Sequence, residues 1–175
     1  MTFLVEDSQT LSLLGEAKYL YLHEIDEPRD NSLRLVVKEA VVNSAKAGPQ
    51  LETERLPVEA LRDAGVLDDA HPIETTDTCR TFELFWKHYV AYLVTEECVG
   101  SRGTYGDEVY TGTLLRRYSK SHFLEHLARD TGGHGRPLLH YKLMCLNHLI
   151  DVASEEPPVI QIIETPAVTP RRELQ

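Results

Sequence analysis

Features that stabilise small secreted domains or mark membrane proteins are scarce in this chain of 175 residues. Its three cysteines, Cys79, Cys98 and Cys145, form no CxxC pair. An odd, scattered set is not a disulfide framework, so we expect reduced thiols. No apolar run approaches the roughly 18 residues of a membrane-spanning helix. Glu6 and Asp7 stand where a secretory signal would need basic residues before an apolar core. These absences predict a cytoplasmic protein.

Basic residues are also in the minority. The 18 Lys and Arg side chains are outnumbered by 28 Asp and Glu side chains, which gives a formal net charge of -10. Such a charge disfavours the phosphates of nucleic acids and of anionic membranes, so we expect neither as a partner. It favours a basic or neutral partner, such as another protein.

Several enzyme motifs are missing from the sequence as well. There is no GxSxG nucleophile motif, and GGHG at 132–135 follows a predicted helix, whereas a phosphate loop precedes one. Ser119, Ser121 and Cys145 lie near histidines along the chain. The serines are better explained as helix caps, and the thiol lies in an apolar run where it is usually inert. The sequence therefore identifies no catalytic residue and no cofactor.

The residues that are present predict one α+β domain, mainly an antiparallel sheet, over residues 1–165, with a flexible tail over residues 166–175. The longest strand signal is Thr81–Val99, which holds the only Trp and no Gly or Pro. Because both of its faces are largely apolar, we expect a single central strand. The apolar run Leu138–Val152 favours a strand, with a helix as the open alternative.

Other segments give local expectations. Turn formers between Lys18–Ile25 and Ser32–Val42 predict a β-hairpin, and residues 113–119 predict a short strand. Pro57 and Gly65 bracket a predicted short helix. Residues 1–15 remain open between helix and strand.

An amphipathic helix is predicted near residues 120–129, capped by Ser119 or Ser121 and packed on the sheet. One face of it carries His122, Glu125 and His126, in the HxxEH form of a zinc-binding motif. No third ligand follows downstream, and Glu125 also suits an ion pair with Arg129. We therefore interpret these residues as a solvated helix face, and keep them only as metal candidates.

A second histidine set consists of His88, His140 and His148, with Asp151 nearby. In one regular strand, His140 and Asp151 would point to opposite faces, and the two histidines of the run would lie roughly 26 Å apart at about 3.3 Å per residue. We therefore interpret His88 and His148 as half-buried strand residues. The remaining candidates for binding are His140, Tyr118 and Arg116.

Three blocks carry a resemblance to known sequences: WKHYVAYLVTEE from Trp86, YSKSHFL from Tyr118 and HYKLMCLNHLIDV from His140. Over about residues 80–153 the chain resembles an uncharacterised family of small bacterial proteins. The resemblance implies a bacterial cytoplasmic protein and a β, βα, β arrangement, but no activity, cofactor or catalytic residue. Thr95 stands where that family often has Asn, so a role for Asn there is not carried over.

Two functions follow as hypotheses. The first is a noncatalytic protein that binds another protein, of the immunity or regulatory kind, because the chain is small and acidic and its apolar segment Val159–Ile163 could pair with a sheet edge. The second is a small hydrolase, either metal-dependent through His122, Glu125 and His126 or dependent on His140 near Tyr118. The oligomeric state is left open.

Overall fold

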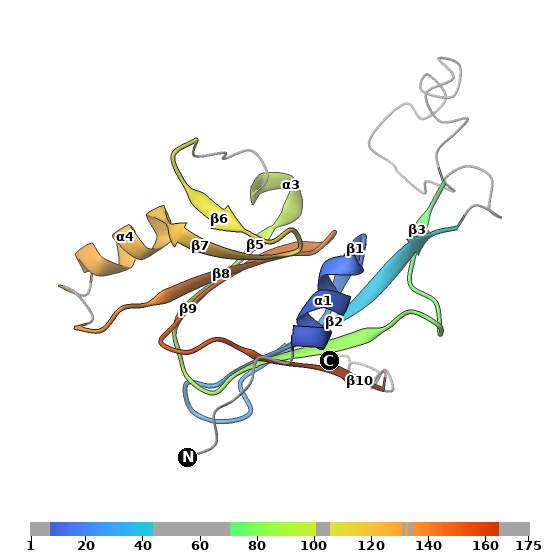
Figure 1. Cartoon of the computed structure of the whole chain (residues 1–175), viewed down its shortest axis with the longest axis horizontal. Coiled ribbons are helices and arrows are strands. Elements are labelled where there is room, and N and C mark those ends of the chain that lie inside the picture. The colour runs from blue at the N-terminus through green and yellow to red at the C-terminus, as the bar shows by residue number, and fades with distance from the viewer. Residues whose placement is uncertain (1–7, 44–70, 101–105, 131, 133–134, 165–175) are drawn as a thin grey trace, which may run out of the picture.

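Two antiparallel β-sheets make up most of the fold (Figure 1). The computed structural model describes residues 8–43, 71–100, 106–130, 132 and 135–164. Within these ranges, each sheet has five strands and the helices are short. None of the described helices has the length and apolar character that crossing a membrane requires. The class is thus largely β, and the expected α+β class overstates the helical part.

The first sheet has the strand order β1-β2-β4-β10, with β3 added beside β2. Its strands are β1 (Tyr19–Asp26), β2 (Leu33–Val42), β3 (Ile73–Glu74), β4 (Thr81–Trp86) and β10 (Val159–Ile163). β1 and β2 form the predicted hairpin, with a bulge between Leu22 and Glu24. Asn31 in its loop has a φ of 59°, a left-handed conformation that Asn tolerates better than most residues.

The second sheet has the strand order β5-β9-β8-β7-β6. Its strands are β5 (Tyr89–Glu96), β6 (Val109–Thr111), β7 (Leu115–Lys120), β8 (Leu139–Met144) and β9 (His148–Ser154). β7 confirms the short strand that the sequence predicts at residues 113–119.

The prediction of one central strand over Thr81–Val99 is wrong. The chain bends at Lys87 and His88, so β4 lies inside the first sheet while β5 is the end strand of the second. Leu93 and Val94 are 50% and 38% exposed. β4 directs Phe82, Leu84 and Trp86 into the core, and Tyr89 and Tyr92 of β5 pack against it.

The run Leu138–Val152 is a hairpin, neither one long strand nor a helix. β8 and β9 pair with each other, and the chain turns at Cys145–Asn147. The parity argument that separated His140 from Asp151 holds only within one strand. Across the hairpin, both side chains lie on one face, because Lys142 pairs with Asp151 and shares its face with His140.

The described helices are short, and α1 (Ser8–Glu16) contributes Leu14 to the core. The other described helices are α3 (Glu97–Gly100) and α4 (His122–Asp130). For residues 8–15, which the sequence leaves open between helix and strand, the structure has the helix α1. α4 confirms the expected helix; none of its residues is fully buried, and it contacts the sheet through Phe123, whose ring lies beside His140. The helix predicted between Pro57 and Gly65 and the tail over 166–175 lie outside the described residues.

Both sheets contribute to one core. Its buried members include Leu35, Phe82 and Trp86 from the first sheet and Tyr141 and Ile150 from the second. The rings of Trp86 and Tyr141 meet edge to face, with centroids 6.2 Å apart. An apolar interior shared by two faces is what holds them together.

Side-chain hydrogen bonds also join the sheets. The Asn147 side chain bonds to the backbone of Leu22 as a neighbouring strand would. Its Oδ1 accepts from the Leu22 N–H at 2.9 Å, and its Nδ2 donates to the Leu22 carbonyl at 3.0 Å. In the hairpin loop, the Glu27 carboxylate accepts from the hydroxyls of Tyr89 and Tyr92 at 2.8 and 3.0 Å. This hydrogen bond raises the pKa of Tyr89.

Candidate functional site

A row of rings crosses three neighbouring strands of the second sheet. The register places Tyr110 opposite Tyr118, and Tyr118 opposite His140. The centroids of Tyr118 and His140 lie 4.3 Å apart in a stacked arrangement, and those of Tyr110 and Tyr118 are 5.2 Å apart. Tyr141 and Leu143 point into the shared core, so this row occupies the opposite face of β8.

His140 is the centre of a buried hydrogen-bonded chain. The Ser121 Oγ lies 2.7 Å from His140 Nδ1, and His140 Nε2 lies 2.9 Å from Asp151 Oδ1. A carboxylate only accepts hydrogen bonds, so Nε2 donates to Asp151. In the neutral ring, Nδ1 then accepts the Ser121 hydroxyl proton. The second oxygen of Asp151 lies 3.3 Å from the Lys142 ammonium.

Local structure explains why these groups meet. Ser121 follows β7 and caps α4, because its Oγ accepts from the Leu124 N–H at 3.1 Å. This confirms Ser121 as one of the two predicted caps. The ring of Phe123, in the first turn of α4, lies 5.1 Å from His140. The β8–β9 hairpin supplies Asp151.

The chain Ser121–His140–Asp151 is closed to solvent. Its residues are 4%, 2% and 6% exposed, respectively. Burial also raises the pKa of Tyr118, against a smaller opposing effect of Arg116. Polar groups buried to this degree are stable only when they are hydrogen-bonded, and the side chains of Ser121, His140 and Asp151 all have such partners.

Arg116 lies beside this cluster. Its guanidinium carbon is 4.4 Å from the centroid of the Tyr110 ring, a cation–π geometry. It pairs in register with Lys142. The three residues proposed from sequence for binding, His140, Tyr118 and Arg116, therefore lie on one face of neighbouring strands.

Sequence reasoning missed the two partners of His140. The parity argument excludes Asp151 only if residues 138–152 form one strand, and the turn at Cys145–Asn147 removes that condition. The signal was present in LNH, a short polar break in the apolar run that suits a hairpin turn. Ser121 was assigned only a capping role, although a cap oxygen can also donate its own proton.

The two histidines of α4 pair with different acidic side chains. His122 Nε2 lies 2.7 Å from Asp107 Oδ1, and its Nδ1 lies 3.2 Å from Glu125 Oε2. His126 instead lies 3.3 Å from Asp130. The hydrogen bond with Asp107 raises the pKa of His122. In the part of the chain that the structure describes, no group of three potential ligands is arranged to hold a metal ion.

The other nucleophile candidates are unreactive or differently engaged. Burial raises the pKa of the Cys145 thiol to about 12, so it stays protonated near neutral pH. Ser119 donates a hydrogen bond to the Val109 carbonyl at 3.2 Å. Cys98 is exposed and Cys79 is buried.

The distances in Ser121–His140–Asp151 suit proton transfer, but the surroundings do not suit acyl transfer. The serine oxygen already interacts with Leu124 N–H and His140. The next backbone N–H, of His122, donates to the Glu108 carboxylate at 2.9 Å. A carboxylate there would oppose the negative charge that develops on a substrate oxygen. The arrangement favours a structural polar network.

The chain matches no protein-family model, and no curated protein or solved structure is significantly similar to it. The resemblance of residues 80–153 to a bacterial family therefore stays a prediction. The function has to be inferred from the geometry described above.

Proposed function

We propose that this protein binds another protein without catalysing a reaction, and that the partner adds a strand to the outer edge of β5. The observation that carries this proposal is the character of that edge. Among the described strands, only β9 pairs with β5. At the start of β5 the Tyr89 N–H donates to the Asn31 carbonyl at 2.8 Å and a bulge lies between Tyr89 and Ala91, so the edge without a described strand beside it runs from Ala91 to Glu96. Residues 89–95 contain no charged side chain.

The apolar side chains of this edge support strand addition. Leu93 and Val94 are both exposed and point to opposite faces, so an added strand would find apolar surface on each side. Long uncharged edges invite pairing with other chains, and proteins usually protect them with charge, bulges or a covering segment. Backbone hydrogen bonds to such an edge are a common way to bind an extended peptide.

The other edges of the two sheets are less suited to this role. At β1, Leu146 N–H and the Asn147 amide already bond to the backbone of Leu20 and Leu22. β6 has three residues and β10 has five, whereas β5 has eight. The length of β5 therefore offers the most backbone hydrogen bonds.

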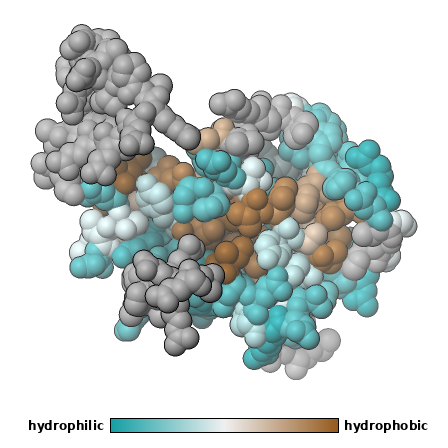
Figure 2. All heavy atoms as spheres, turned by 180° about the vertical axis from the view of Figure 1, so that it is seen from behind, coloured by the Kyte–Doolittle hydropathy of each residue, from teal (hydrophilic) through white to brown (hydrophobic). Residues whose placement is uncertain are grey.

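The segment Val159–Ile163 is an edge strand of the first sheet and is therefore not the segment that we propose for partner binding. The sequence predicts that it can pair with a sheet edge, and it does so within its own chain as β10, the end strand beside β4. The exposed apolar surface available to a partner is broader than this segment. Figure 2 shows apolar residues gathered in a band across the middle of one face, between hydrophilic regions.

The proposal is tested by charging the edge. Leu93→Lys and Val94→Lys place ammonium groups on both faces of β5 and should abolish binding of extended peptides selected from a random displayed library on the wild-type protein. Val159→Lys is the matched control, since Val159 is 41% exposed on the end strand of the other sheet. Binding is measured by biolayer interferometry.

Comparison of the two β5 variants with Val159→Lys separates the possible results. Loss in the β5 variants with retention in Val159→Lys supports the proposal. Equal binding by all proteins, or loss only in Val159→Lys, would reject β5 as the binding edge. Circular dichroism spectra should be unchanged in every variant, because the substituted side chains are exposed.

A second candidate function is a His-dependent hydrolase. The observation in its favour is the chain Ser121–His140–Asp151, with its distances of 2.7 and 2.9 Å. Burial of Ser121 and the carboxylate of Glu108 weigh against it. Labelling of Ser121 by a fluorophosphonate probe would favour this candidate over strand binding.

A further inference from the structure

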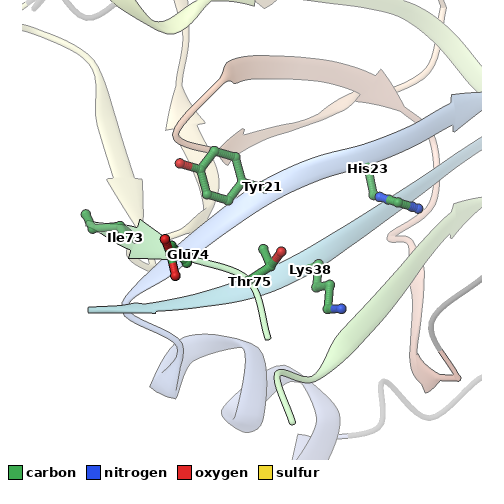
Figure 3. Close-up of a pocket in the computed structure, with 6 residues that line it drawn as sticks. All are labelled: Tyr21, His23, Lys38, Ile73, Glu74 and Thr75. Carbon is green, nitrogen blue, oxygen red and sulfur yellow. The ribbon is translucent and has the colours of Figure 1, made fainter. Parts of the chain in front are cut away.

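An open hollow of about 470 Å³ lies on the first sheet, where residues of β1 and β2 meet β3, which pairs with the end of β2. It is lined by Tyr21, His23, Lys38, Ile73, Glu74 and Thr75 (Figure 3). Tyr21 and Lys38 face each other across β1 and β2. Lys38 lies on the face away from the core, because its neighbour Val37 points into the core. The volume is within the range of small-molecule sites, about 300–1,000 Å³.

Lys38 differs from the other half-buried cations. Within the described residues, Arg34, Arg80 and Lys142 all pair with carboxylates, and Arg116 lies over an aromatic ring. Lys38 is also half-buried, yet its ammonium makes no hydrogen bond or ion pair in the described part of the molecule. In a chain with 28 acidic residues, such a cation is available to an external anion.

Other polar side chains accompany the ammonium. In Figure 3, Lys38 lies between His23 and Thr75, and the Tyr21 ring stands above β1. Across the described ranges, none of the side chains of Tyr21, His23 and Thr75 has a hydrogen-bond partner. Glu74 is different, because its Oε2 accepts from the Asn43 amide at 3.0 Å.

We propose that this hollow binds a small organic monocarboxylate with an apolar or aromatic body. Lys38 supplies one positive charge, which matches one carboxylate. Hydroxyl groups of Tyr21 and Thr75 can donate to the carboxylate oxygens. Glu74 adds a negative charge to the same wall, which disfavours a dianion such as phosphate. Ile73 and the Tyr21 ring provide apolar contact for the body of the ligand.

The test uses phenylacetate as the probe, followed by amide chemical-shift changes of the full chain. Phenylacetate should shift signals of the lining residues in a saturable way, whereas neutral phenylacetamide and inorganic phosphate should not. Lys38→Met keeps the apolar stem and should weaken the affinity by about tenfold or more. Lys38→Arg keeps the charge and should retain most of the affinity.

Lys87→Met is the matched control, because Lys87 is exposed, far from β3 in the first sheet's register, and makes no described ion pair. It should bind phenylacetate like the wild type. The proposal is overturned if phenylacetate produces no saturable shifts at the lining residues. It is equally overturned if phosphate or phenylacetamide binds as well, or if Lys87→Met loses as much affinity as Lys38→Met. The same spectra show whether each variant is folded.

Discussion

Two polar clusters, one on each sheet, contain the same kinds of side chain and differ in how their hydrogen bonds are completed. In the His140 network, the Ser121 hydroxyl, the imidazole and the Asp151 carboxylate are partnered with one another and are nearly inaccessible. In the hollow, Tyr21, His23 and Lys38 are accessible and make no hydrogen bond within the described residues.

Whether the hydrogen bonds of a polar cluster are completed within the protein indicates whether the cluster has a structural role or is available to a ligand. A buried polar group has a high cost if one partner is removed, because the other is left unsatisfied away from water. An accessible group that lacks a partner is solvated, and loses little when it is replaced. The distances alone would have selected the His140 network as the active site, whereas burial and completed hydrogen bonds indicate a structural role.

The largest effect should follow from removing Asp151. Asp151→Ala leaves His140 Nε2–H and the Lys142 ammonium without their acceptor, and should lower the free energy of unfolding by about 3–5 kcal/mol. Urea unfolding measures this. Asp130→Ala, which removes an exposed partner of His126, should change it by less than about 0.5 kcal/mol. Similar effects for the two variants would contradict the structural role of the network.

A smaller loss is expected for Ser121. Ser121→Ala removes the cap of α4 and the hydroxyl bonded to His140, and should destabilise the protein by about 1–3 kcal/mol. Ser119→Ala is the control, since Ser119 is exposed, and should change stability by less than about 0.5 kcal/mol. The wild-type protein should not react with a fluorophosphonate. Covalent labelling at Ser121 would show that the network is catalytic.

The hollow should respond differently, with little change in stability. Lys38→Met should alter the free energy of unfolding by no more than about 0.5 kcal/mol, because no described contact is lost. Arg34→Met is the comparison, since Arg34 on the same strand bonds to Glu83 and Glu24. It should cost about 1–2 kcal/mol. If Lys38→Met is the more destabilising variant, the ammonium has a structural partner.

The smallest effect is expected for the exposed ion pair between Asp107 and His122. Lys120 and His122 lower the pKa of Asp107 to about 2, and Asp107 raises the pKa of His122. The raised pKa means that His122 contributes stability at low pH, which is lost as the pH rises through its folded-state pKa. Asp107→Asn should return the His122 pKa toward 6.5, as followed by NMR of the imidazole signals. Glu125→Gln should lower it less, and a larger effect of Glu125→Gln would reverse the assigned causes.

The sequence was sufficient where a signal was local. The β1–β2 hairpin, the strand before Ser121 and the helix after it follow from turn formers, alternation and a capping serine. Non-local features were not accessible in this way. The bend at Lys87 and His88 contains no Gly or Pro that would signal it in the sequence. It arises because the residues before and after it pack in different sheets. The meeting of His140 with Asp151 depends on strand pairing, which periodicity alone does not specify. Tyr118 and His140 were selected by type, and their stacking required the register.

The position of β10 has a consequence for how the protein forms during synthesis. β10 pairs with β4, and every strand of the second sheet lies between them along the chain. On the ribosome, the strands of the second sheet are all made before β10 emerges, so they can assemble while the first sheet still lacks its last member. A nascent chain stopped before Val159 should therefore expose the edge of β4, which carries Phe82 and Leu84, to chaperones.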